Sequence, residues 1–288
     1  MDIRELREAS ERLMSCSDLT YYPIAIKFAK SEEEVPEGAI RPFRDTGNKW
    51  AVCQLIQKAR REGVTYAMTQ EDHWCWYPQI SYGHVKLEKG NYDYEVTLNN
   101  VGIPHVEREL KFVDKIPHLD YNANYATLIA PINVAEYVPD LILIYCDNAQ
   151  ILRRLIGAVK YLDGDMLATE LDYVNSCCWS MIPTYQTRKF RVTIPDPGEF
   201  ERAEIGASEM ILSVPTERYV EVCDTMVMKE ARFAKRPGIH TGLVPYFARP
   251  EFIDNLYKYW GLEHGRNISW TEAQRGYDNN TYPGDEKK

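Results

Sequence analysis

Apolar positions along the chain fall into short uninterrupted runs and into stretches with helical spacing, and the two kinds of stretch alternate. The spacing predicts an opening helix over residues 2–15. Uninterrupted apolar runs predict buried strands at residues 22–28 and 139–145. Helical spacing follows each of them, over residues 53–62 and 149–159. This order is typical of a protein that mixes strands and helices in one domain.

Weaker signals predict the remaining elements. Thr69 and Asp72 have the spacing of a capping box, which predicts a short helix that begins there and presents Cys75. Polar and apolar residues alternate at 84–98 and 106–116, which predicts a hairpin or meander. The later part of the chain is expected to add strands at 190–194 and 210–215 and a helix at 216–229.

The order strand, helix, Cys-Trp occurs twice, which indicates an internal repeat. The matched pairs are residues 23–28 with 140–145, Cys53-Gln54 with Ala149-Gln150, and Cys75-Trp76 with Cys178-Trp179. We therefore expect a mixed α/β (α+β) fold of two pseudo-repeated strand-helix halves related by a pseudo-twofold axis. The first half, with a strand-rich connector, is residues 1–135, the second is 136–229, and a C-terminal arm, helix and loose tail follow at 230–288.

Composition and charge limit the cell compartments and the classes of partner that the protein is expected to have. The net charge is −9, and basic residues are scattered among acidic ones, which argues against nucleic acid or an anionic membrane as a partner. Apolar runs are all shorter than the 18 to 20 residues that cross a bilayer, and the first 15 residues are charged throughout, unlike a signal peptide. We expect a cytoplasmic protein with a small-molecule substrate, and the sequence leaves a homo-oligomer open.

The cysteines are the strongest candidates for chemistry. Seven cysteines, an odd number without regular spacing, are expected to be reduced thiols. A pseudo-twofold axis would bring Cys75 and Cys178 to a common interface, and Cys53, at a helix N-terminus, would have its thiolate favoured by the helix dipole. Three such thiolates can hold a [4Fe–4S] cluster with one iron open. The plainer alternative is that these cysteines are small buried hydrophobes.

Cys177 and Cys178 compete for the third position. Adjacent side chains point opposite ways on a strand and diverge by about 100° on a helix, so we expect only one of the two to be a ligand. The repeat favours Cys178, and nothing local excludes Cys177. The remaining three cysteines are expected to be structural: Cys16, Cys146 and Cys223.

Acid–base and aromatic residues gather near Cys75. Glu71, His73 and Tyr82 are the candidate catalytic residues, because a histidine beside a metal-bound substrate can move protons at neutral pH. Glu71 has a simpler alternative role as a helix cap. The 20 tyrosines and 6 tryptophans suggest an oxygenated, aromatic substrate. The sequence contains no Walker-type loop, G-x-G-x-x-G, G-x-S-x-G or H-E-x-x-H motif, which disfavours those chemistries.

The short motifs together resemble the uncharacterised ArCR family, the domain of unknown function numbered 169. The resemblance covers residues 15–228 and rests on the strand at 23–28, Cys53-Gln54 with Gly63, Cys75 with Gly83, the cysteine pair with Pro183, and Val214-Pro215. Proteins of this family are common in anaerobic microbes, which suits an oxygen-sensitive cluster. Similar proteins usually carry a further glycine- and cysteine-bearing motif where this chain has residues 194–198, so its ligand set or substrate is expected to differ.

Three hypotheses follow. The first is an iron–sulfur lyase or oxidoreductase in which Cys53, Cys75 and Cys178 or Cys177 hold a [4Fe–4S] cluster. The second is a non-catalytic module in which the same cysteines hold zinc or respond to oxidation. The third is an enzyme with a thiol nucleophile, Cys53 or Cys75, served by His73.

Overall fold

The structure is a computed structural model that describes residues 2–86, 105–234 and 256–261. The chain divides into two compact units, Met1–Glu230 and Ala231–Lys288. Both predicted halves therefore lie in a single unit, because they share one sheet.

The sheet has six strands, in the order β2-β3-β1-β4-β6-β5, and every pairing in it is antiparallel. The strands are β1 (Ile24–Ala29), β2 (Tyr66–Met68), β3 (Ala126–Pro131), β4 (Leu141–Cys146), β5 (Arg191–Thr193) and β6 (Met210–Pro215). The helices are α1 (Ile3–Cys16), α2 (Pro42–Thr46), α3 (Val52–Glu62), α4 (Trp76–Ser81), α6 (Val106–Val113), α7 (Ala149–Asp163), α8 (Ser176–Thr187), α9 (Pro197–Arg202) and α10 (Thr216–Ala234), with a 3-10 turn at Glu32–Glu34.

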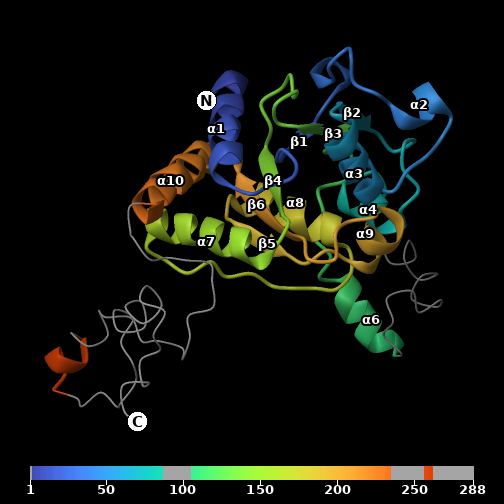
Figure 1. Cartoon of the computed structure of the whole chain (residues 1–288). Helices are drawn as coiled ribbons and strands as arrows, with labels where there is room; N and C mark the ends of the chain where they lie inside the picture. The colour runs from blue at the N-terminus through green and yellow to red at the C-terminus, as the bar shows by residue number, and fades with distance from the viewer. Residues whose placement is uncertain (1, 87–104, 235–255, 262–288) are drawn as a thin grey trace, which may run out of the picture. The chain divides into compact units, whose positions relative to one another are not determined.

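Helices cover both faces of the sheet (Figure 1). One apolar core joins α1, α7 and α10 to one face, and the other joins α3 and α8 to the opposite face. Side chains alternate along β4 between the two cores: Ile142 and Ile144 enter the first, and Leu141 and Leu143 the second. All six residues of β4 are buried, which explains why this strand is an uninterrupted apolar run in the sequence.

The two halves repeat the same topology. In the first, β1, α3, β2, α4 and β3 occur in this order, and in the second β4, α8, β5, α9 and β6 do so, with α2, α6 and α7 as additional helices between them. The strand registers also repeat: Ile24 pairs with Pro131 as Leu141 pairs with Pro215. Helix packing follows the same rule, because α3 lies on β3 and against α9, while α8 lies on β6 and against α4. The predicted pair of pseudo-repeated halves is confirmed.

The residue matching within the repeat was wrong. The sequence pairs Cys53 with Ala149 and Cys75 with Cys178, but Ala149 begins α7, which packs on the face opposite α3. A twofold axis perpendicular to the sheet keeps each helix on its own face. The partner of α3 is therefore α8, and Cys53 corresponds to Cys177.

Local predictions held for most of the elements, including β5, β6 and α10, and failed at residues 69–75 and 106–113. Residues 69–72 form a turn in which the Asp72 carboxylate accepts from the backbone and side chain of Thr69, and the next helix begins only at Trp76. Residues 106–113 are helical instead of extended, because apolar residues at 106, 110 and 113 also fit a helical stripe. The rest of the predicted hairpin, residues 87–98, lies outside the described residues.

Candidate functional site

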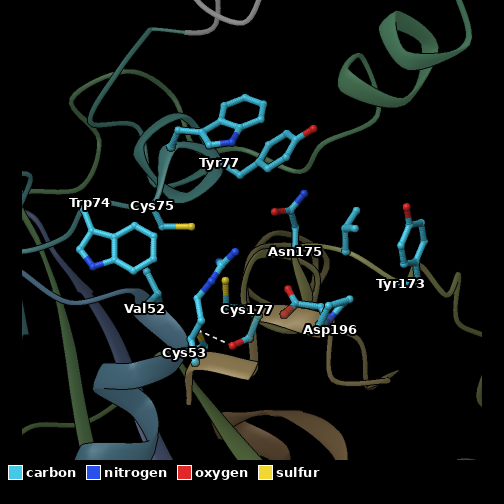
Figure 2. Close-up of a pocket in the computed structure, with 14 residues that line it drawn as sticks. Val52, Cys53, Trp74, Cys75, Tyr77, Tyr173, Asn175, Cys177 and Asp196 are labelled. Atoms are coloured by element: carbon cyan, nitrogen blue, oxygen red, sulfur yellow. Dashed lines mark hydrogen bonds between the residues drawn. The ribbon is translucent and has the colours of Figure 1, made fainter. Parts of the chain in front are cut away.

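A cavity of about 350 Å³ opens where the N-termini of α3, α4, α8 and α9 meet (Figure 2). The packing of α3 against α9 and of α4 against α8 brings these N-termini together. The residues lining the cavity include Cys53, Cys75, Cys177, Asp196, Asn175, Arg202, Trp74, Trp76, Tyr77 and Tyr173. Three of the four cysteines predicted to form a site thus border one space.

The repeat explains why these side chains converge. Cys53 is the second residue of α3, and Cys177 is the second residue of α8. Cys75 is the N-cap residue of α4, and Asp196 is the N-cap residue of α9. Each half therefore contributes one residue at the second position of a helix and one N-cap residue, giving three cysteines and one aspartate.

Cys53 is 7% exposed, and its Sγ lies 3.8 Å from the carbonyl oxygen of Gly198, to which the thiol donates. Burial raises its pKa, and the nearby carboxylates of Glu199 and Asp196 raise it further. This outcome differs from the expected stabilisation of the thiolate by the helix dipole, because desolvation and two acidic groups outweigh it. Without a bound cation Cys53 is a neutral thiol.

Of the adjacent pair, Cys177 lines the cavity, and Cys178 is fully buried in the core beneath it. The two Sγ atoms are 4.0 Å apart. Contact with the Cys178 thiol, together with burial, raises the pKa of Cys177. The sequence favoured Cys178, but the turn of the helix places Cys177 at the cavity.

Asp196 ties two of the converging helices together. Its Oδ1 accepts a hydrogen bond from the backbone N–H of Glu199 at 2.9 Å, and its Oδ2 accepts from the backbone N–H of Ser176 at 3.0 Å. These bonds fix the carboxylate between α8 and α9. The signal for this residue was in the sequence, because Asp followed by Pro is typical of a helix N-cap and first position.

Sequence analysis also missed two polar groups at the cavity. Asn175 has a left-handed backbone (φ 57°), and its buried Nδ2 has no hydrogen-bond partner among the described residues. The guanidinium carbon of Arg202 lies 5.6 Å from the centre of the Trp74 ring. Nearby, the rings of Trp76 and Tyr77 stack with their centres 3.5 Å apart. The cavity thus combines thiols, hydrogen-bond donors and flat aromatic surfaces.

None of the three predicted catalytic residues lines this cavity. Tyr82 is fully buried and donates to the backbone carbonyl of Cys177 at 3.0 Å, which fixes the first turn of α8. His73 is buried, and its Nε2 lies 3.0 Å from Nδ1 of His84. Glu71 is exposed and lines a different cavity. Their catalytic role stays a prediction.

Across residues 2–86, 105–234 and 256–261, no three His, Cys, Asp or Glu side chains stand close enough to hold a single metal ion. Ligands of one zinc ion must lie within roughly 4 Å of each other, since each Zn–S bond is about 2.3 Å. Cysteines bound to different irons of a cluster stand further apart. Within these ranges the side chains therefore form no ready site for a single metal ion, and the cluster stays a prediction.

The fold and the site define a class: a mixed α/β protein whose single antiparallel sheet consists of two repeated halves, with a cysteine-lined cavity at their junction. The model of the uncharacterised ArCR family, the domain of unknown function numbered 169, matches residues 12–225, and the chain belongs to this family. The predicted resemblance is confirmed.

A relative from Methanocaldococcus jannaschii, itself described as uncharacterised, is 27% identical over 239 residues, which cover 78% of this chain and 95% of the relative. No solved structure matches the chain. Of the helices in the described ranges, none is both long and apolar enough to cross a membrane.

Proposed function

We propose that this protein is an iron–sulfur enzyme in which Cys53, Cys75 and Cys177 hold a [4Fe–4S] cluster. Asp196 would stand at the position that no cysteine occupies, and that position would be open to a small oxygenated substrate. One observation carries this proposal: equivalent positions of the two halves place three cysteines and one aspartate around a single cavity. When bound, the cluster would supply a Lewis acid or an entry point for electrons, for lyase or oxidoreductase chemistry.

The donor types support an asymmetric ligand set. Thiolates are soft ligands suited to iron–sulfur clusters, whereas a carboxylate is a harder and more readily displaced ligand. Asp196 is already oriented by backbone N–H groups from α8 and α9, so a bound cluster would meet a fixed carboxylate. The Asp196 carboxylate would therefore be the donor that a substrate oxygen could replace.

The other lining residues indicate what kind of substrate fits. Arg202 supplies a cation, and the buried amide nitrogen of Asn175 supplies a donor, so a carboxylate or other oxygenated group would be bound there. Trp76 and Tyr77 add flat apolar surface. These groups favour an oxygenated substrate with an aromatic ring.

The thiol-nucleophile hypothesis has less support. Nε2 of His73 is bonded to His84, and its Nδ1 has no hydrogen-bond partner in the described part of the chain, so His73 does not hydrogen-bond a cysteine thiol. Burial, with a contribution from His84, lowers the pKa of His73 to about 3. Burial also keeps the Cys53 thiol protonated. A nucleophilic cysteine needs the opposite arrangement.

The test is iron and sulfide content after anaerobic purification. We expect a coloured protein with about four irons and four sulfides per chain. Single Cys53→Ser, Cys75→Ser and Cys177→Ser variants should lose most of both, whereas Cys16→Ser, on the opposite side of the sheet, should retain them. Colourless protein without iron contradicts the proposal, and one zinc per chain, with unfolding on chelation, favours the structural-metal hypothesis.

A further inference from the structure

A second cavity, of about 470 Å³, lies apart from the cysteines in the same compact unit. Its walls come from the ends of β1 and β2 and from the segments before β3 and after α4. The residues that matter for its chemistry are Lys30, Arg41, Glu71, His84, Asn124 and Tyr125. It shares no lining residue with the cysteine cavity.

Two side chains that line this cavity are buried, and each has one polar atom without a partner in the described part of the chain. His84 is 7% exposed and Asn124 is 3% exposed. Within the described part of the chain, neither Nε2 of His84 nor Oδ1 of Asn124 has a hydrogen-bond partner. A buried polar atom without a partner costs folding free energy, so such atoms usually serve a ligand or a bound solvent molecule.

The other polar atoms of these two side chains are occupied. Nδ1 of His84 lies 3.0 Å from Nε2 of His73, and Nδ2 of Asn124 donates to Oγ1 of Thr127 at 3.0 Å. These bonds fix the imidazole and the amide in place. The unpartnered atoms are therefore held in fixed positions before any ligand binds.

The floor of the cavity requires a ligand group that donates a hydrogen. Oδ1 of Asn124 can only accept. Burial lowers the pKa of His84 to about 4, so the ring is neutral at pH 7 and its Nε2 donates or accepts according to its tautomer. A hydroxyl or an ammonium group satisfies Asn124, and either can adapt to His84.

The mouth of the cavity favours an anionic group. Lys30 is exposed there, and Arg41 is held in place by Glu32 and Tyr125. Arg41 is already paired with Glu32, so exposed Lys30 is the cation that can attract a carboxylate. Glu71 also lines the cavity, and its negative charge would attract the ammonium group of a ligand.

We propose that this second cavity binds a small carboxylate that carries a hydroxyl or an amino group on the neighbouring carbon. The donor group occupies the floor at Asn124 and His84, and the carboxylate faces Lys30 and Arg41. His84 contacts His73, and Cys75 follows His73 two residues later. One hydrogen bond therefore joins a residue of this cavity to the segment that leads to the cysteine cavity.

The experiment is calorimetric titration of the full chain with four probes. Lactate and alanine, as both enantiomers, carry the carboxylate and the donor. Propionate lacks the donor, and 1,2-propanediol lacks the carboxylate. We expect lactate or alanine to bind at least about tenfold more tightly than the other two, because a site with buried polar atoms rejects an analogue that leaves them unpaired.

Variants separate the two forms of the ligand. Asn124→Leu should weaken binding of whichever probe binds by about tenfold or more, and Lys30→Ala, an exposed change that leaves the fold intact, should also weaken it. Glu71→Gln should weaken alanine and leave lactate unchanged. Lys189→Ala, on an exposed residue elsewhere, should change nothing.

Three results overturn the proposal. The first is that none of the probes binds, which would mean that the cavity holds solvent only. The second is that propionate binds as tightly as lactate and alanine. The third is that both Asn124→Leu and Lys30→Ala bind the probes as tightly as the wild type does. Cys53→Ser should bind the probes as the wild type does. The result is therefore independent of the proposed cluster.

Discussion

Cys53 and Cys177 occupy the same position in two helices that the internal repeat relates: each is the second residue of its helix, and both line one cavity. The strand registers of the two halves match pair for pair, so this correspondence is a property of the whole sheet. The same relation makes Asp196 the counterpart of Cys75. The site therefore lies at the junction of two similar halves that differ in one donor.

The first prediction separates the two adjacent cysteines. Cys177→Ser should remove most of the iron and sulfide from anaerobically purified protein, whereas Cys178→Ser should retain both. The reason is that Cys177 lines the cavity and Cys178 is buried in the core behind it. The reverse result would show that α8 presents its other cysteine. Thermal unfolding of both variants checks that neither result comes from misfolding.

The second prediction concerns Asp196. A cluster held by three cysteines has one labile iron, so mild oxidation of the wild type should yield a [3Fe–4S] species visible by electron paramagnetic resonance. Asp196→Cys would place a thiolate opposite Cys75, and we expect this variant to retain all four irons under the same oxidation. Asp224→Cys, on α10, is the matched control. Equal loss of iron from Asp196→Cys and the wild type would contradict the role of this position.

The third prediction tests a glycine that precedes His84. Gly83 has φ +74°, and a Cβ atom built there would lie 2.4 Å from the backbone oxygen of Asp120. Gly83→Ala should lower the free energy of unfolding in urea by at least about 2 kcal/mol. Gly38→Ala is the control, because a Cβ there meets nothing within 4 Å, and its effect should stay within about 0.5 kcal/mol. Equal effects would contradict the close approach.

The fourth prediction concerns pH. Burial, with a contribution from Asp196, raises the pKa of Glu199 from 4.5 to about 8, and its Oε1 accepts from the Tyr145 hydroxyl at 3.3 Å. Between these two pKa values the folded state binds more protons than the unfolded state, so stability must fall as pH rises. Each pKa unit corresponds to about 1.4 kcal/mol, which makes the fall on the order of a few kcal/mol.

The free energy of unfolding in urea, measured between about pH 5 and 9, tests this effect, because this range spans the two pKa values of Glu199. Glu199→Gln should flatten the dependence, because the amide does not titrate. Glu201→Gln, an exposed change on the same helix, should leave it unchanged. A wild-type protein whose stability rises over this range would show that Glu199 is ionised in the folded state.

Much of the fold follows from local patterns. Apolar runs and helical spacing predicted β1, β4, β5, β6, α1, α3, α7 and most of α10 to within a few residues. The strand β3 was missed although all six of its residues are buried, and other missed elements have weak patterns. The strand β2 has three residues, and α8 contains Pro183 and follows a left-handed Asn175, so neither gives a clear period.

The sequence by itself determined that the chain contains two repeated halves and that its cysteines are the strongest candidates for a functional site. Only the tertiary structure decided which residues correspond, and it placed Cys177 at the cavity in place of Cys178, together with Asp196. The physical reason is that hydrophobic periodicity shows which side of a helix or strand is buried. It does not show on which face of the sheet a helix packs. That choice depends on strand order and register, which form only when both halves are paired.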